Sequence, residues 1–221
     1  MLYIVSTPIG NLKDISLRAL EVLKNVELIA AEDTRHTRKL LAHYDIHTPL
    51  TSYFEHNKFV KSPYLLRKLE EGKDIALVSD SGTPGISDPG YRLITLAIEN
   101  KIPLTCVPGP TALINALVLS GFPTDRFIFE GYLPVKPGAR QKRIREILQE
   151  KRTVICYESP HRLLKSLQDM QVLADREIVV LRELTKKFEQ VVRGSAASVL
   201  GHFQEHPPRG EFVIVVAKPM P

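Results

Sequence analysis

The stretch VSDSGTPGISDPG, residues 78–90, indicates the fold class most directly. It continues the apolar run DIALVSD at 74–80, which predicts a buried strand that ends at Asp80. Its last nine residues hold three glycines and two prolines, more conformational restriction than a tight turn with Asx caps requires. Open α/β sheets bind ligands where their strands end, so the stretch predicts a ligand site on such a sheet.

Outward from this stretch, short β-branched runs alternate with helical stretches, which predicts α/β layers and a largely parallel sheet. The predicted strands lie at 2–6, 27–31, 74–80, 127–133, 153–158, 177–184 and 211–218, and two further strands are expected before EHN at 55–57 and at the start of LTCVPGP, residues 104–110. The predicted helices lie at 16–26, 34–43, 60–71, 89–100, 111–120, 138–151, 159–173 and 195–204. A hinge near 120–126 predicts an N-terminal α/β domain over 1–121 and a C-terminal α/β domain over 122–221.

The composition is that of a globular protein, with 43% hydrophobic and 25% charged residues among 221. No apolar run approaches the roughly 18–20 residues that span a bilayer. The start MLYIVSTPIG has no basic n-region, so it predicts a core strand rather than a signal peptide, and a cytoplasmic location. Cys106 and Cys156 lie in apolar runs and are predicted to be buried strand residues. No Cys/His spacing predicts a metal site.

Two further loops also follow predicted strands, STPIGN at 6–11 and VPGPTA at 107–112. Three loops stiffened by proline and glycine should then lie at one edge of the sheet. None matches the phosphate loop GxxxxGK[ST] or the dinucleotide motif GxGxxG. These loops contain no lysine, which argues against a triphosphate and favours a ligand with a positive centre.

Polar motifs follow other strands of the first half. AEDTRHTRK at 31–39 places Glu32 and Asp33 at a strand end and Arg35, Arg38 and Lys39 on the first helical turns. The motif fits acid–base chemistry beside a phosphate contact, and equally an acidic N-cap before a solvated basic helix. In EHN at 55–57, His56 is a candidate for substrate contact or proton relay, with an exposed surface histidine as the alternative.

In the second half, YESPHR at 157–162 and RELTKKFE at 182–189 again lie where strands end. The helix predicted at 138–151 carries Arg140 and Arg143 among other basic residues. It could track phosphates or present a solvated face. The formal net charge of +5 is a further indication of an anionic partner.

Seven motifs, in this order and spacing, resemble the small-subunit ribosomal RNA (cytidine-2′-O)-methyltransferases, a family of the tetrapyrrole-methylase fold class. They are TPIGN, AEDTR, DSGTPGISDPG, VPGP, FEGYLP, YESPHR and RELTK. The resemblance runs from Leu2 to about Ala217 and implies two αβα domains with S-adenosylmethionine bound in the active cleft between them. It further implies methylation of a cytidine 2′-hydroxyl in the decoding region of 16S rRNA or of the small ribosomal subunit, and a homodimer.

Carried over position by position, the resemblance also implies the site residues. The cofactor contacts would be Pro8, Asp80, Ser81, Gly82, Ile86, Pro110, Thr111, Ala112, Tyr157, Glu158 and Ser159. The RNA contacts that the basic segments predict are Arg35, Arg38, Lys39, Arg140 and Arg143. Ser6 stands where many members of that family have glycine, a change that a strand end should tolerate.

Displacement at the methyl group of a sulfonium needs alignment rather than a metal. A ribose hydroxyl also needs a base or a nearby cation to lose its proton. The candidates for this catalytic role are Asp33, His56, Glu183 and Lys186. Two alternative functions remain at this point. One is a methyltransferase of the same fold that acts on a corrinoid or porphyrin precursor, and the other is a non-catalytic RNA-binding module.

Overall fold

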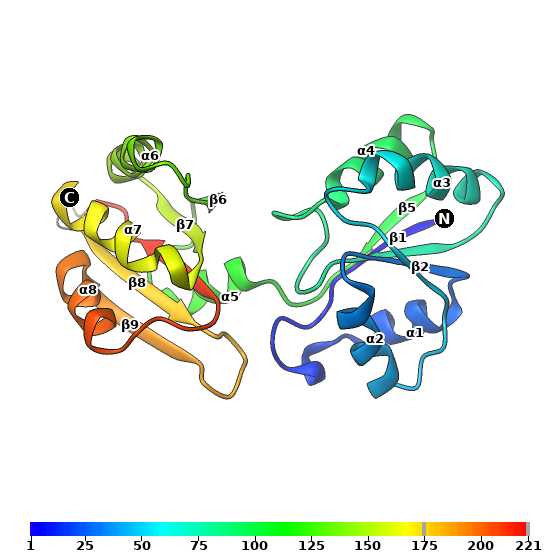
Figure 1. The fold of residues 1–221 in the computed structure, drawn as a ribbon, viewed down its shortest axis with the longest axis horizontal. Helices are drawn as coiled ribbons and strands as arrows, with labels where there is room; N and C mark the ends of the chain where they lie inside the picture. Colours follow the sequence, from blue (N-terminus) through cyan, green and yellow to red (C-terminus); the bar gives the residue numbers. More distant parts are fainter. Residues whose placement is uncertain (174–175, 220–221) are drawn as a thin grey trace. The chain divides into compact units, whose positions relative to one another are not determined.

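The computed structural model describes residues 1–173 and 176–219, and these form two compact units, Met1–Thr111 and Ala112–Pro221 (Figure 1). Each unit is built around its own five-stranded sheet. The predicted alternation of strands and helices is present in both.

The sheet of the first unit has the strand order β3-β2-β4-β1-β5, and all its pairs are parallel, as predicted. Its strands are β1 (Leu2–Val5), β2 (Leu28–Ala31), β3 (Leu50–Ser52), β4 (Ile75–Val78) and β5 (Leu104–Val107). Because the strands are parallel, all their carboxyl ends lie at one edge of the sheet.

Four helices cover this sheet, two on each face, and Figure 1 shows the strands between them. They are α1 (Leu17–Asn25), α2 (Thr34–His43), α3 (Lys58–Glu70) and α4 (Gly90–Glu99), with a short 3-10 turn at Leu12–Asp14. The chain leaves β1 and β2 toward the α1–α2 face, and leaves β3 and β4 toward the α3–α4 face. Neighbouring strands β1 and β4 therefore send their loops in opposite directions, which opens a binding crevice at the sheet edge.

The alternation of side chains along each strand explains both faces. In β4, Ala76 and Val78 belong to the core cluster under α1 and α2, whereas Ile75 and Leu77 belong to the cluster under α3 and α4. All four side chains are buried, which explains why the sequence of this strand is a continuous apolar run. Side-chain caps fix the starts of α1 and α2, since Ser16 Oγ accepts from the Ala19 N–H and Asp33 Oδ1 from the Arg35 N–H.

The sheet of the second unit has the order β6-β7-β10-β8-β9, and only its β6–β7 pair is parallel. The expectation of a largely parallel sheet is wrong here. The connection 183–189 between β8 and β9 is too short for the crossover of a dozen or more residues that a parallel pair requires. The strands are β6 (Phe127–Tyr132), β7 (Thr153–Glu158), β8 (Glu177–Arg182), β9 (Gln190–Ser195) and β10 (Phe212–Val216); β9 was not predicted.

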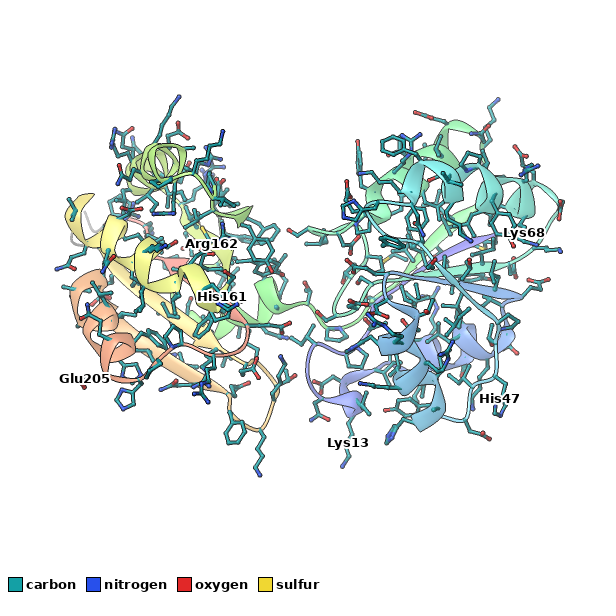
Figure 2. All side chains as sticks on the ribbon, in the orientation of Figure 1. Lys13, His47, Lys68, His161, Arg162 and Glu205 are labelled. Carbon is teal, nitrogen blue, oxygen red and sulfur yellow. The ribbon has the colours of Figure 1, made fainter. Side chains whose placement is uncertain are left out.

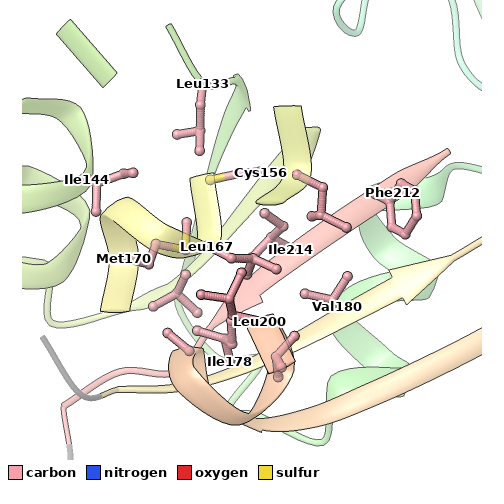
Figure 3. Packing of buried hydrophobic residues seen from close by; sticks show 14 of the residues in the cluster. Leu133, Ile144, Cys156, Leu167, Met170, Ile178, Val180, Leu200, Phe212 and Ile214 are labelled. Atoms are coloured by element: carbon pink, nitrogen blue, oxygen red, sulfur yellow. The ribbon is translucent and has the colours of Figure 1, made fainter. Parts of the chain in front are cut away.

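Three helices of the second unit pack over one apolar cluster with alternate residues of its strands (Figure 3). Ile144, Leu167 and Leu200 come from these helices, and Cys156 and Ile214 from the strands. The helices are α6 (Pro137–Gln149), α7 (Pro160–Leu173) and α8 (Ala196–Glu205). A fourth helix, α5 (Ala112–Ser120), packs on β7 and β10. Therefore α5, which we expected to close the first domain, lies in the second compact unit.

The two cysteines differ in their surroundings. Cys156 is buried, and its burial raises the pKa of the thiol far above the ordinary value. Cys106 is exposed, contrary to the prediction, because it lies on the edge strand β5. Within residues 1–173 and 176–219, no helix has the length and apolar character needed to cross a bilayer.

Candidate active site

Hydrogen bonds join the loops after β1 and β4 at the carboxyl edge of the first sheet. The backbone of Thr7 pairs with the backbone of Gly82 in both directions, with N···O distances of 2.9 and 3.0 Å. The Thr7 hydroxyl donates to the Ser79 carbonyl at 3.1 Å, and the Ser6 hydroxyl lies 2.9 Å from that of Thr83. The two loops therefore form one rigid rim, in which the Ser6 side chain is buried and takes part.

Two glycines of this rim allow close backbone packing. Gly82 has a φ of +81°, a conformation that side chains with a Cβ rarely adopt, and its position faces Ile9 and the Pro110 carbonyl. A Cβ on Gly109 would lie 2.8 Å from the Cβ of Ser6, so the loop after β5 can approach the loop after β1 only with glycine here. The three loops predicted to share the edge do meet there.

Asp88 holds the rest of the GTPGISDPG loop in shape. Its Oδ1 accepts from the Gly85 N–H at 2.7 Å and from the Gly90 N–H at 2.8 Å, so it closes the loop and begins α4. Burial raises the pKa of this carboxyl, although these hydrogen bonds partly oppose the effect. Ser87, between them, has a φ of +63°. The loop is thus set by its own polar contacts as well as by its prolines.

The ends of β2 and β4 are joined by their acidic residues. The Asp33 N–H donates to Asp80 Oδ1 at 2.9 Å, and the Asp80 N–H points to Glu32 Oε2 at 3.3 Å. Burial, together with the negative charges of Asp80, Asp88 and Asp33, raises the pKa of Glu32. In the part of the chain that the structure describes, no cation forms a salt bridge with Glu32, Asp80 or Asp88, although the charge of Arg35 acts on Asp80 from the neighbouring Asp33 pair. The edge therefore carries an excess of negative charge.

The structure gives Asp33, a predicted catalytic residue, a capping role instead. Its carboxylate accepts from the Arg35 backbone N–H at 2.8 Å and from the Arg35 guanidinium at 2.7 and 3.1 Å. The hydrogen bonds from Arg35 hold the pKa of Asp33 far below its usual range, so this carboxylate is a weak proton acceptor. The Arg35 guanidinium is bound to the Asp33 carboxylate, while Arg38 and Lys39 are exposed on α2. The sequence placed Glu32 and Asp33 together at this strand end, but only Asp33 was kept among the catalytic candidates.

His56 lies in the exposed loop between β3 and α3, and its ring meets the Phe54 ring edge-on at 6.2 Å. Beside this loop is a shallow hollow at the sheet edge, lined by Glu32, Glu55, Ser87, Asp88 and Pro89. A second, narrow pocket on the other side of the rim is lined by Thr7, Pro8, Leu12, His36, Thr37, Leu40, Ser79 and Asp80. Pro8 and Asp80, both predicted cofactor contacts, therefore line one pocket.

The other predicted cofactor contacts of the first unit lie on the same rim. Ser81 and Ile86 are exposed in the loop after β4, with Ile86 42% exposed. Pro110 and Thr111 end the first unit in the loop after β5, and Ala112 begins α5 in the second unit.

The predicted contacts of the second unit form a cluster at the end of β7. Tyr157 meets the rings of Phe129 and Tyr132 at centroid distances of 4.8 and 5.7 Å. Glu158 is buried, and its carboxylate is bound by Arg162 at 2.7 Å, by the Ser159 N–H at 2.8 Å and by the Ser166 hydroxyl at 2.6 Å. These partners indicate that Glu158 organises the turn rather than touching a ligand.

Glu183 and Lys186 lie in the loop after β8, where they bind each other. Lys186 Nζ is 2.9 Å from Glu183 Oε1 and 2.8 Å from Glu211 Oε2. Burial alone would raise the pKa of Glu183, but the hydrogen bonds from Lys186 and the Glu211 N–H and the nearby cations lower it. Burial opposes the charge of Lys186, but its two carboxylate partners raise its pKa. As arranged, neither group is suited to accept a proton at neutral pH.

Two of the predicted RNA contacts are used within the second unit. Arg140 is 5% exposed, and its Nε lies 2.7 Å from Asp169 Oδ2. Arg143 bonds to Glu130 and Glu146. The prediction for Arg140 is therefore corrected, because a buried and paired guanidinium is not available to a phosphate, and Arg143 is neutralised by two carboxylates. Asp169 and Glu130 come from other segments, α7 and β6, which the basic character of the helix sequence could not reveal, whereas Glu146 lies on α6 itself.

As an arrangement, the rim of the first unit suits a ligand with a positive centre. It offers backbone groups from rigid loops and three carboxylates that form no salt bridge in the described residues, which would repel phosphate and attract a sulfonium or ammonium. No group of three or more His, Cys, Asp or Glu residues in the described ranges could hold a metal ion.

Comparison with known proteins gives this arrangement a context. A family model described as Tetrapyrrole (Corrin/Porphyrin) Methylases matches residues 1–200. The chain is 52% identical over 223 residues to the ribosomal RNA small subunit methyltransferase I of Synechocystis sp., with 100% of this chain and 80% of that protein covered. It is 44% identical to the protein of the same name from Thermotoga maritima, with 98% and 97% covered.

Two solved structures show the same fold. A cobalt precorrin-4 methyltransferase has a TM-score of 0.73 at 17% identity, with 98% of this chain and 94% of that chain covered. A uroporphyrin-III C-methyl transferase from Thermus thermophilus, complexed with S-adenyl homocysteine, has a TM-score of 0.68 at 17% identity, with 98% and 96% covered. At such identities the likeness concerns the fold alone, and it confirms the predicted fold class.

Proposed function

Since this chain belongs to the ribosomal RNA small subunit methyltransferase I family of the tetrapyrrole methylases, we propose that it methylates the 2′-hydroxyl of a cytidine in the decoding region of 16S rRNA. It is an S-adenosylmethionine-dependent methyltransferase of ribosomal RNA, as the sequence predicted. The particular nucleotide and the acceptor oxygen are our proposal. The structural observation that carries it is the rigid, acidic rim after β1, β4 and β5, which suits a sulfonium cofactor.

The residues of the rim fit this cofactor. Gly82 and Gly109 leave room for close backbone approach, and Asp80 supplies negative charge beside the narrow pocket that Pro8 also lines. We propose these rim residues, with Ser81, Ile86, Pro110 and Thr111, as the contacts that the first unit makes. Ala112, Tyr157 and Ser159 are the proposed contacts of the second unit, and Glu158 the residue that positions the last two.

When bound, S-adenosylmethionine supplies a methyl group attached to a positively charged sulfur. The protein's part is to hold the acceptor hydroxyl in line and to receive its proton, and alignment alone can supply several kcal/mol of the barrier. Carboxylates near the positive sulfur favour the bound ground state, so only those positioned to receive the proton raise the rate.

We propose Glu32 as the proton acceptor of the first unit. Its pKa is raised by burial and by its acidic neighbours, and a base is most effective when its pKa approaches the working pH. Its side chain also lines the open hollow, through which a ribose could approach. Asp33 is the weaker candidate because Arg35 holds its carboxylate. His56, Glu183 and Lys186 were predicted as catalytic candidates, and we now propose them for substrate contact, the last two as a fixed charged pair.

For RNA contact, Arg38 and Lys39 are the better candidates among the predicted residues. Both are exposed on α2, whereas Arg35 is engaged by Asp33 and Arg140 by Asp169. The homodimer is also a proposal, which sedimentation velocity of the purified protein can test. A ribosomal RNA substrate would place the activity in the cytoplasm.

The rival reaction is methylation of a corrinoid or porphyrin precursor. The structures that carry out such reactions are 17% identical to this chain, whereas the ribosomal RNA methyltransferases are 44% and 52% identical over nearly its whole length. The closer relationship favours RNA. The alternative of a non-catalytic RNA-binding module predicts no cofactor binding.

A methyl-transfer assay tests the proposal. Purified protein, labelled S-adenosylmethionine and small ribosomal subunits lacking this modification are incubated, and the labelled nucleotide is mapped. We expect label on a ribose 2′-oxygen of one cytidine in the decoding region. Label on a base, on another nucleotide or on added uroporphyrinogen instead of RNA would refute the assignment, and calorimetry without cofactor binding would favour the non-catalytic module.

A further inference from the structure

An exposed face of the first unit combines aromatic rings with cations, outside the residues considered so far. It is formed by α3 and the first turn of α4, and we call it the α3–α4 face. Its rings are exposed, Phe59 by 64%, Tyr64 by 37% and Tyr91 by 71%. Lys61, Lys68 and Arg92 provide its cations.

The cations lie over the rings. The Arg92 guanidinium carbon is 4.4 Å from the centroid of Phe59, and the ammonium groups of Lys61 and Lys68 are 5.2 and 5.1 Å from that of Tyr64. Arg92 Nε is buried without a hydrogen-bond partner, and Arg92 forms no ion pair with any residue in the described ranges. Figure 2 labels Lys68, which marks this helix among the side chains of the unit.

The face also begins at the candidate site. Phe59 lies just after the loop that follows β3, and in this loop Asn57 Nδ2 donates to Ser52 Oγ at 3.1 Å. Arg92 lies two residues after Gly90, whose backbone N–H is bound by the Asp88 carboxylate. The hollow lined by Glu55, Pro89 and the proposed base Glu32 lies between these two loops. Ser62, buried on α3, bonds to the Tyr53 hydroxyl at 3.0 Å and keeps the start of the helix in place. The face is therefore a fixed surface that leads to Glu32.

We propose that the α3–α4 face binds a single-stranded segment of the RNA substrate next to the methylated nucleotide. This inference rests on the function proposed above and adds the surface that receives the RNA. Bases stack on exposed aromatic rings and on arginine guanidinium planes, so Tyr91 and the Arg92 guanidinium that lies over Phe59 offer stacking surfaces, and the lysine ammonium groups meet the phosphates between the bases.

Charge decides between RNA and a second copy of this chain. The face carries Lys61, Arg67, Lys68 and Arg92, with Glu70 as its acidic residue on α3. In a twofold interface the same patch meets its own copy, so these cations would face one another and repel. A polyanion is attracted by the same charges.

Two variants test the proposal, with a short fluorescein-labelled single-stranded RNA as the probe. Phe59→Ala combined with Tyr91→Ala removes two exposed rings, and Lys61→Gln combined with Lys68→Gln removes two cations. The matched control is Ile98→Ala, 59% exposed near the end of α4 and away from the loops. We expect the ring variant to weaken RNA binding about fivefold or more per ring at every salt concentration. The lysine variant should flatten the slope of log K against log salt by about 0.7 for each lost phosphate contact.

S-adenosylmethionine affinity, measured by calorimetry, should stay unchanged in all three variants, and Ile98→Ala should bind RNA like the wild type. If both double variants bind RNA as the wild type does, the proposal is overturned; a lost self-association in sedimentation would then assign the face to a second copy. Assays of the wild-type protein distinguish a failure of this inference from a failure of the proposed function. If it binds the probe through this face but methylates no small subunit, the proposed function fails while the RNA-binding face stands.

Discussion

The backbone N–H of Asp33 donates to the carboxylate of Asp80 at 2.9 Å, so the end of β2 is fastened to the end of β4 through a side chain of the candidate site. The Asp80 N–H points back to Glu32 at 3.3 Å. In this reciprocal contact Asp80 has two functions, since its charge faces the rim and its oxygen atom holds the neighbouring strand end. Replacement by alanine would remove both, whereas Asp80→Asn removes the charge and keeps an acceptor oxygen.

We expect Gly82→Val to abolish S-adenosylmethionine binding. A β-branched residue is strained at a φ of +81°, and its side chain would push against Ile9 and the loop after β5. The control is Gly72→Val, because Gly72 has a similar φ of +83° with nothing within 4 Å of its Cβ position. Calorimetry should show normal binding in the control only. Equal binding in both variants would remove the rim from the cofactor site.

For the chemical step, we expect Glu32→Gln to lower the single-turnover rate by about 100-fold, the range for a lost general base. Asp33→Asn should stay within a few-fold of the wild type, because asparagine also caps a helix and the Asp33 carboxylate is already held by Arg35. The rate of the wild type should fall on acidification as Glu32 is protonated, and Glu32→Gln should lack this acidic limb. A slow Asp33→Asn variant beside a normal Glu32→Gln variant would reverse the assignment.

Glu32→Gln should lower the rate of methyl transfer but raise the stability of the fold. The pKa of Glu32 is higher in the folded protein than its ordinary value of 4.5, so its stabilising contribution is complete below that value. It is lost as the pH rises through the folded pKa, because the buried carboxylate must then ionise. Glu32→Gln should therefore gain stability relative to the wild type between about pH 4 and about pH 8. Urea denaturation at both pH values measures the change, and a gain that shrinks with rising pH would contradict it.

Arg140→Met should destabilise the protein by about 3 kcal/mol, because it leaves the Asp169 carboxylate buried without its cation. Gln141 Nε2 still donates to Asp169 at 3.0 Å, which keeps the loss at the lower end of the usual range. Adding Asp169→Leu should restore most of the stability, since an apolar pair can replace a buried ion pair. Thermal denaturation of the single and double variants measures both effects. A fully stable Arg140→Met would show that the pair is dispensable.

The salt dependence of RNA binding should identify the phosphate contacts among the basic residues. Arg38→Gln combined with Lys39→Gln should flatten the slope of log K against log salt by about one unit per lost contact on a duplex segment. Arg143→Gln should leave the slope nearly unchanged, because Glu130 and Glu146 already neutralise this guanidinium. Binding to small subunits over a range of salt concentrations gives the comparison. The reverse pattern would return the RNA contact to α6.

Much of the fold follows from the sequence because its signals are local. The apolar runs of β1 and β4, the helical spacing of α1 and the restricted loop 78–90 each depend on residues close together in the chain. The sequence also indicated that the loops after β1, β4 and β5 meet, since parallel strands end at one edge. The strand β9 was missed because it lies at the sheet edge and none of its residues is buried, so it has no apolar run of the kind that marks the other strands. The antiparallel pairing of β10 with β7 and β8 was missed because it joins segments that are distant in the chain.

The amino-acid sequence by itself determined the α/β alternation, the position of the rigid loop and the family to which the chain belongs. Only the tertiary structure decided which charged groups are available for chemistry. Arg140 and Asp169 are 29 positions apart, yet their ion pair turns a predicted RNA contact into a buried link between α6 and α7. Glu32 and Asp33 are adjacent in the sequence, but their pKa values move in opposite directions because one is desolvated among carboxylates and the other is bound by Arg35. Hydrophobic periodicity and loop restriction depend on residues that are close together in the sequence, whereas desolvation and ion pairing depend on which distant segments the fold brings into contact.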